Sequence, residues 1–194
     1  MKRIIALLLA ALMCVAVLAA CGGNSGTTAN TDTDTDANTD NGSAEVTVST
    51  FDAGNISADV PDGWKAFASN DLFSDEEGKT DPDVINICKG GETDLDMLTK
   101  PYIRITYYAP ETTMFEPDKD FYDDVADMDD VTIGDKTWHA FSCTSIGYKY
   151  IMMWTGEDGE DQYQAALLYE STDGSFKLED ADVQTIMASI RKSN

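Results

Sequence analysis

The run "YKYIMMWTGEDGEDQYQAALLYE" (residues 148–170) contains two β-rich segments joined by a short polar loop. Alternate residues are aromatic or apolar in both segments: Tyr148, Tyr150, Met152 and Trp154 in the first, and Tyr163, Ala165, Leu167 and Tyr169 in the second. A period of two places each set on one face of a strand. The loop "GEDGED" (156–161) contains two glycines, as hairpin loops often do. We therefore predict an antiparallel hairpin over these residues.

Working outward, five further segments have strand composition: residues 45–51, 55–69, 84–88, 102–109 and 136–143. Two segments have helical spacing. In "PDKDFYDDVADM" (117–128), Phe121, Val125 and Met128 recur at helical intervals, and "LEDADVQTIMASIRKS" (178–193) carries an apolar stripe of Val183, Ile186, Met187 and Ile190. We predict an α+β domain, in which helices pack on the faces of an antiparallel β-sheet.

The two ends of this region resemble those of PsbP/Mog1-like domains. The residues that carry the resemblance are "FDAGNISADVPDGW" (51–64) and "IMASIR" (186–191). The resemblance implies an αβα sandwich around an antiparallel sheet. It implies no functional residues, because none of the matching positions has reactive chemistry.

The N-terminal residues resemble an export signal. A positive start (Lys2, Arg3) precedes an uncharged run over residues 4–20, which ends in "LAAC" (18–21). This tetrapeptide resembles the lipobox of bacterial lipoproteins, whose cysteine receives a diacylglycerol thioether. We predict a signal peptide over residues 1–20 and lipidation at Cys21. The lipid would anchor the protein to the extracytoplasmic face of the cell membrane.

Residues 21–44 have the composition of a disordered linker, and residues 45–194 that of one globular domain. The linker contains "TDTDTDANTD" (31–40), whose alternating aspartates raise the question of a calcium loop. Asp34, Asp36, Asn38 and Glu45 fit positions 1, 3, 5 and 12 of an EF-hand loop, but Thr39 stands where that loop needs glycine, and no helices flank it. We interpret the segment as a tether.

The chain is strongly acidic, with 36 Asp and Glu against 13 Lys and Arg and a formal net charge of −23. Nucleic acid and anionic lipid headgroups would be repelled, so we predict no nucleic-acid binding. Cys88 and Cys143 remain after Cys14 and Cys21 are assigned to the leader and the lipid site. They could form a disulfide outside the cytoplasm. Neither has the spacing of a zinc or redox motif, and we predict no cofactor and no metal apart from the lipid on Cys21.

The sequence offers little catalytic chemistry. His139 is the one histidine, and no G-x-S-x-G pattern accompanies it, so we interpret it as structural or exposed. Carboxylates in the 156–161 loop could form a weak cation site: Glu157, Asp158, Glu160 and Asp161. Tyr107 and Tyr108 are adjacent, so one of them must point away from the core and could join a binding face.

We therefore predict a membrane-anchored binding or accessory module of the cell envelope that is not an enzyme, with an envelope protein or other ligand as its partner. Two alternatives stay open. One is an envelope hydrolase that uses a carboxylate of raised pKa. The other is a calcium-modulated adhesin or structural module.

Overall fold

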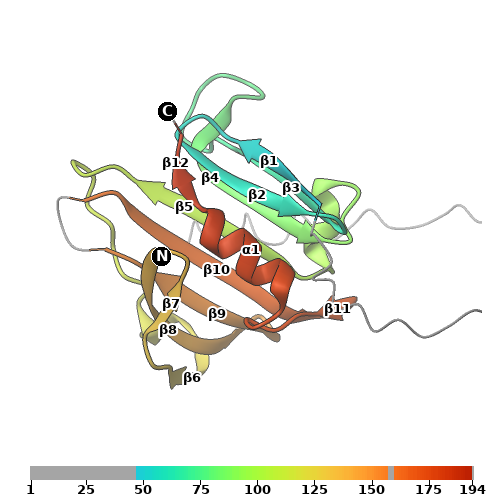
Figure 1. Cartoon of the computed structure of the whole chain (residues 1–194), viewed down its shortest axis with the longest axis vertical. Helices are drawn as coiled ribbons and strands as arrows, with labels where there is room; N and C mark the ends of the chain where they lie inside the picture. The colour runs from blue at the N-terminus through green and yellow to red at the C-terminus, as the bar shows by residue number, and fades with distance from the viewer. Residues whose placement is uncertain (1–46, 157–159, 194) are drawn as a thin grey trace, which may run out of the picture. The chain divides into compact units, whose positions relative to one another are not determined.

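The computed structural model describes residues 47–156 and 160–193. These described residues belong to one compact unit. A large antiparallel sheet dominates this unit, with strands in the order β3-β4-β5-β10-β9-β8-β6 (Figure 1). The strands along this path are β3 (Trp64–Asn70), β4 (Thr80–Lys89), β5 (Tyr102–Tyr108), β10 (Gln162–Ser171), β9 (Tyr148–Trp154), β8 (Lys136–Ser145) and β6 (Asp123–Asp127). Two short strands extend it, because β7 (Val131–Ile133) pairs with β8 and β11 (Gly174–Ser175) pairs with β10.

The hairpin predicted over residues 148–170 is confirmed. It consists of β9 and β10, which pair antiparallel with Gln164 opposite Trp154 and Leu168 opposite Tyr150. The two predicted sets of alternating side chains lie on opposite faces of the sheet. Tyr163, Ala165 and Leu167 join the main core, whereas Tyr150 and Trp154 pack on the other side.

A second, smaller sheet and one α-helix cover one face of the large sheet, which we call the first face. The small sheet contains β1 (Val48–Asp52), β2 (Ile56–Pro61) and β12 (Arg191–Lys192), and the helix is α1 (Ala181–Ser189). In Figure 1, α1 lies in front of β10 beside β2. The main core fills the space between these layers. Its fully buried residues include Ile56 from β2, Ile87 and Ile105 from the large sheet, and Ile186 from α1.

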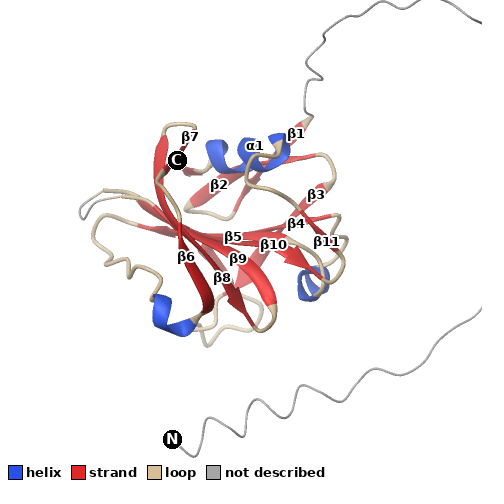
Figure 2. Ribbon diagram, turned by 90° about the horizontal axis from the view of Figure 1, so that it is seen from below, coloured by secondary structure: helices blue, strands red, loops and turns tan. Residues whose placement is uncertain are grey.

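The predicted α+β class, with helices packed on the sheet faces, is wrong. Within residues 47–156 and 160–193 the protein has one α-helix and two single-turn 3-10 helices, η1 (Asp94–Leu98) and η2 (Lys119–Phe121), and most of the remainder is strand. The fold is therefore β-rich, and the αβα sandwich implied by the resemblance to PsbP/Mog1-like domains is wrong as well. Among the described residues, the side opposite α1 carries the two 3-10 helices and loops (Figure 2).

The helix predicted over residues 117–128 accounts for most of this error. The segment forms η2 and the edge strand β6, which pairs with β8. In a helix Asp123 and Asp127 would lie one turn apart and repel each other, as like charges do at that spacing. As a strand, the segment packs Val125 against the buried cluster of Phe141, Cys143 and Met152. The apolar spacing was compatible with both structures, and strand pairing decides between them.

The C-terminal helix is confirmed in its apolar stripe but ends earlier than predicted. Val183, Ile186 and Met187 are buried in α1. Ile190 is also buried, at 1% exposed, but it follows the helix in extended backbone. Arg191 and Lys192 lie inside the segment with helical spacing, yet they form β12 and pair with β2. The sheet edge therefore ends the helix.

Candidate functional site

The second face of the large sheet, opposite α1, is lined by rows of side chains from adjacent strands. The middle row contains Phe67 from β3, Asn86 from β4, Arg104 from β5, Ala166 from β10, Met152 from β9 and Phe141 from β8. One neighbouring row contains Cys88, Tyr102, Leu168, Tyr150 and Cys143, and the other contains Val84, Thr106, Gln164, Trp154 and His139. This face is thus mostly aromatic and apolar, with one arginine at its centre.

The part of the second face over β8, β9 and β10 is closed by the connection between β5 and β6. Phe141 is fully buried, and Tyr122 packs on it with ring centroids 5.8 Å apart. The Lys119 ammonium lies 5.5 Å from the centre of the same Phe141 ring. Gln164 Nε2 donates a hydrogen bond of 3.1 Å to the backbone oxygen of Phe115. These contacts form a second small core that is separate from the main one.

The part of the second face over the beginning of β3 and the end of β4 is covered by the backbone that leads into η1. A Cβ placed on Gly91 would lie 2.9 Å from Cys88 Cβ and 3.5 Å from the Phe67 ring, so only glycine allows this approach. Lys65 Nζ donates a hydrogen bond of 2.6 Å to the Glu92 backbone oxygen. In the strand register, Arg104 lies between these two closed parts of the face.

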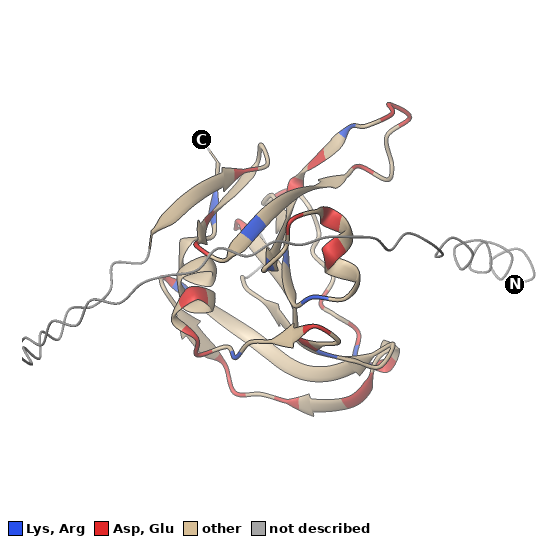
Figure 3. Ribbon diagram, turned by 90° about the vertical axis from the view of Figure 1, so that its right-hand side faces the viewer, with Lys and Arg blue, Asp and Glu red and all other residues tan. Residues whose placement is uncertain are grey.

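Arg104 is exposed and has few polar contacts. Among the described residues its one hydrogen bond is to Asn86 Oδ1, at 3.5 Å. Nine other lysines and arginines of the same region have a carboxylate oxygen within 4.0 Å: Lys65, Lys79, Lys89, Lys100, Lys119, Lys136, Lys149, Arg191 and Lys192. Asp and Glu are spread over the loops and strand ends, and basic residues are sparse (Figure 3). In such an acidic domain, a guanidinium with no carboxylate oxygen within 4.0 Å in the described ranges is a local exception.

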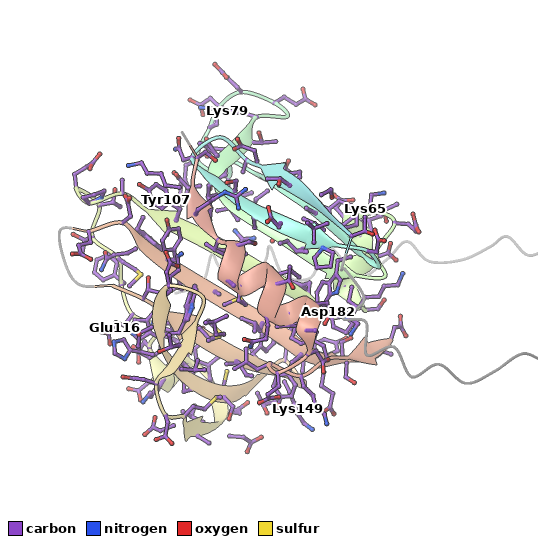
Figure 4. The ribbon with its side chains drawn as sticks, viewed as in Figure 1. Lys65, Lys79, Tyr107, Glu116, Lys149 and Asp182 are labelled. Atoms are coloured by element: carbon purple, nitrogen blue, oxygen red, sulfur yellow. The ribbon has the colours of Figure 1, made fainter. Side chains whose placement is uncertain are left out.

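The adjacent tyrosines of β5 point to opposite faces. Tyr107 belongs to the main core at 4% exposed, and its hydroxyl donates a hydrogen bond of 2.6 Å to Asp161 Oδ1 (Figure 4). Tyr108 lies on the second face and is partly exposed. Burial raises the pKa of Tyr108, while the positive charge of Arg104 acts in the opposite direction. Tyr108 is thus the member of the pair that is available to a binding face.

The predicted cation loop is only partly within the described residues. Glu157 and Asp158 lie outside them, whereas Glu160 and Asp161 line a cavity of about 630 Å³ near the beginnings of β8 and β10. Asp161 already accepts the Tyr107 hydrogen bond and lies 3.4 Å from Lys192 Nζ. Within the described ranges, no group of three or more His, Cys, Asp or Glu side chains is arranged to hold a metal ion.

His139 lies at the end of a row on the second face. Its Nδ1 is 2.8 Å from Asp130 Oδ1, and its side chain is about half exposed at 49%. The ring lies 5.7 Å from the Trp154 ring. In the described part of the chain no serine or cysteine hydrogen-bonds to His139, so the structure brings no nucleophile to it.

The hydrolase alternative requires a carboxyl group of raised pKa. In the described part of the chain, every carboxyl group with a shifted pKa has it lowered. Hydrogen bonds are the main cause at Asp52, Asp96 and Asp135. At Asp182 burial raises the pKa, but the Trp64 hydrogen bond and the nearby Lys89 outweigh it. This alternative therefore gains no support from the described carboxylates.

The structure does not bring Cys88 and Cys143 together. Both are free and buried, and burial raises the pKa of each thiol. They stand in the same row, but β5, β10 and β9 separate their strands. Four strand spacings place their Cα atoms roughly 19 Å apart, whereas a disulfide needs less than about 7 Å.

Several predictions of the sequence fall outside the described residues. These are the signal peptide (residues 1–20), the lipid site Cys21, and the linker with its aspartates (residues 21–44). Among the helices that the structure does describe, none has the length and apolar character needed to cross a membrane.

Comparison with known proteins yields little. No family model matches the chain, and no curated protein matches it. Among solved structures, the chain is similar to a protein from Bacteroides thetaiotaomicron VPI-5482, with 14% sequence identity and a TM-score of 0.38. The similarity covers 75% of this chain and 48% of that protein, so the chain spans about half of the other protein's length.

Arg104 is the residue that reasoning from sequence missed. The segment "YIRITYYA" (102–109) is predicted as a strand, and its alternation places Arg104 on the face of the strand away from Ile103 and Ile105. An arginine in the middle of such a segment is a usable signal. Its neighbours Asn86 and Ala166 come from distant parts of the chain and depend on strand register.

Proposed function

We propose that the protein is a lipid-anchored, extracytoplasmic binding module of the cell envelope, and that its ligand contacts the second face of the large sheet around Arg104. The observation that supports this choice is the Arg104 guanidinium, which has no carboxylate within 4.0 Å among the described residues and lies on a mostly aromatic and apolar face, in the stretch between its two closed parts. Exposed aromatic and arginine side chains are enriched where proteins bind partners. The cavity near Asp161 is a weaker candidate, because Asp135, Lys136 and Asp161 in its lining are already paired.

The anchor follows from the lipobox "LAAC" (18–21) and from the tether that would separate the lipid from the domain. Diacylglycerol and a further acyl chain on one cysteine hold a protein firmly at a membrane. Replacing Cys21 by alanine should release the protein from the membrane fraction and abolish acyl labelling. Cys14→Ala is the matched control, because it removes the other leader cysteine and should change neither property. Membrane-bound, labelled Cys21→Ala protein would contradict the anchor.

The binding face can be located without knowing the natural ligand. A set of small neutral and charged aromatic compounds can be titrated into ¹⁵N-labelled protein (residues 21–194 with Cys21→Ser), while backbone amide shifts are recorded. We expect the saturable shifts to concentrate in β4, β5 and β10 near Asn86, Arg104 and Ala166. Shifts that concentrate around Asp135 and Tyr163, or that scatter over the domain, would refute the proposal.

A further inference from the structure

The uncovered stretch of the second face is short, which limits the size of its ligand. On one side the backbone at Gly91 lies against Cys88, which is aligned with Tyr102 of β5. On the other side Phe115 is bonded to Gln164, which is aligned with Thr106 of β5. Tyr102 and Thr106 are four residues apart along β5, which corresponds to a distance of about 13 Å. This length suits a small molecule better than a long peptide segment.

The groups along this stretch indicate the chemistry of the ligand. A guanidinium presents five N–H donors in a fixed planar fork, which matches a carboxylate with two parallel hydrogen bonds. Arg104 donates one weak hydrogen bond, to Asn86 Oδ1 at 3.5 Å, so most of its N–H donors face solvent. Its neighbour on the other side is Ala166, whose small side chain leaves room beside the guanidinium. Tyr102, two residues before Arg104 on the same face of β5, offers aromatic surface to an apolar body at the edge of this stretch.

The charge of the rest of the protein restricts the anion further. With a formal net charge of −23, the protein repels anions at long range, and a polyanion is repelled more than a monoanion. A ligand with one carboxylate and an apolar body can bind Arg104 and the aromatic surface beside it with the least electrostatic repulsion from the rest of the protein.

We propose that the second face recognises a small carboxylic acid with an aromatic or aliphatic body, and that Arg104 binds its carboxylate. This inference rests on the proposed function, since it assigns a ligand class to the same face. Arg104 contacts the ligand directly, and Tyr102 beside it contacts the apolar body of the ligand.

The test compares two probes that differ in charge and little in shape, 3-phenylpropionate and 3-phenylpropionamide, with inorganic phosphate as a third. Each is titrated into ¹⁵N-labelled protein (residues 21–194 with Cys21→Ser), and affinity is taken from amide shifts in β5. We expect the carboxylate to bind at least tenfold more tightly than the amide, and phosphate to leave the β5 amides unshifted. Weak, millimolar affinity is sufficient for this comparison.

Three variants complete the test. Arg104→Met keeps the side-chain length without the charge and should weaken carboxylate binding at least tenfold. Arg104→Lys keeps the charge without the fork and should give an intermediate loss. Lys177→Met is the matched control, because Lys177 is an exposed cation that also has no carboxylate within 4.0 Å in the described region and lies in the turn before α1. It should change the affinity less than twofold. Circular dichroism confirms that each variant is folded.

The outcomes separate the two proposals. Equal binding of acid and amide on β5, or unchanged binding by Arg104→Met, would overturn the carboxylate site and leave the binding face in place. Binding of all probes elsewhere, or of none of them at all, would overturn both. Stronger binding of phosphate than of 3-phenylpropionate would show that Arg104 is a general anion site, which contradicts the proposed ligand class.

Discussion

The hydrogen bond between Trp64 and Asp182 joins the large sheet to α1, and we predict that its loss destabilises the domain measurably. Trp64 Nε1 donates to Asp182 Oδ2 at 2.6 Å, and Lys89 Nζ lies 3.6 Å from the same oxygen (Figure 4). Trp64 is 8% exposed, so its indole N–H has little access to water once the carboxylate is removed. Asp182→Ala should therefore lower the free energy of unfolding by about 1.5–3 kcal/mol.

In thermal unfolding this corresponds to a decrease in Tm of roughly 3–12 °C for a domain of this size. Asp182→Asn keeps an oxygen acceptor for Trp64 and removes only the charge near Lys89 and the start of α1. It should cost about 0.5–1 kcal/mol. The matched control is Glu179→Gln, an exposed acid just before α1, which should change stability by less than about 0.5 kcal/mol.

The effect should depend on pH in a definite direction. Burial alone would raise the pKa of Asp182, but the Trp64 hydrogen bond and Lys89 lower it below its ordinary value. A carboxyl group with a lowered folded-state pKa stabilises the protein above its unfolded-state pKa of about 3.9, and this contribution is lost as pH falls through the folded-state value. The stability difference between wild type and Asp182→Asn should therefore shrink as pH falls below about 4.

Urea unfolding followed by tryptophan fluorescence measures these differences at pH 7, 5 and 3. The reasoning is refuted if Asp182→Ala unfolds at the same urea concentration as Glu179→Gln. It is also refuted if the loss in Asp182→Asn stays constant down to pH 3, since the charge of Asp182 would then contribute nothing.

Two further predictions concern side chains that are buried on the two faces of the large sheet. Cys88 and Cys143 should resist alkylation in the native protein and both react in denaturant without reductant, because they are buried thiols in separate strands; a bridged peptide after proteolysis would contradict this. Ile105→Ala, at the fully buried centre of the first face, should cost about 2–5 kcal/mol in urea unfolding. Phe73→Ala, fully exposed in the loop after β3, should cost less than about 0.5 kcal/mol, and equal losses from the two would contradict the assigned core.

The local alternation of side chains allowed the strands to be predicted from sequence, because a period of two needs no knowledge of distant contacts. The hairpin of β9 and β10 and the apolar stripe of α1 follow directly from such spacing. The fold class was wrong because residues 117–128 carry apolar residues at intervals that suit either a helix or an edge strand. Pairing with β8, a long-range contact, selects the strand.

The difference between local alternation and long-range pairing also explains which features of the candidate site the sequence predicts. Alternation in β5 separates Ile103 and Ile105 from Arg104, so the sequence already places the arginine away from the core. That Arg104 has no carboxylate within 4.0 Å among the described residues depends on register, because a shift of β10 by one residue would exchange Ala166 for a side chain of the other face. A binding site made from one residue of each of several strands has no local sequence pattern. Its residues become recognisable as a set only when the strand order and register are known.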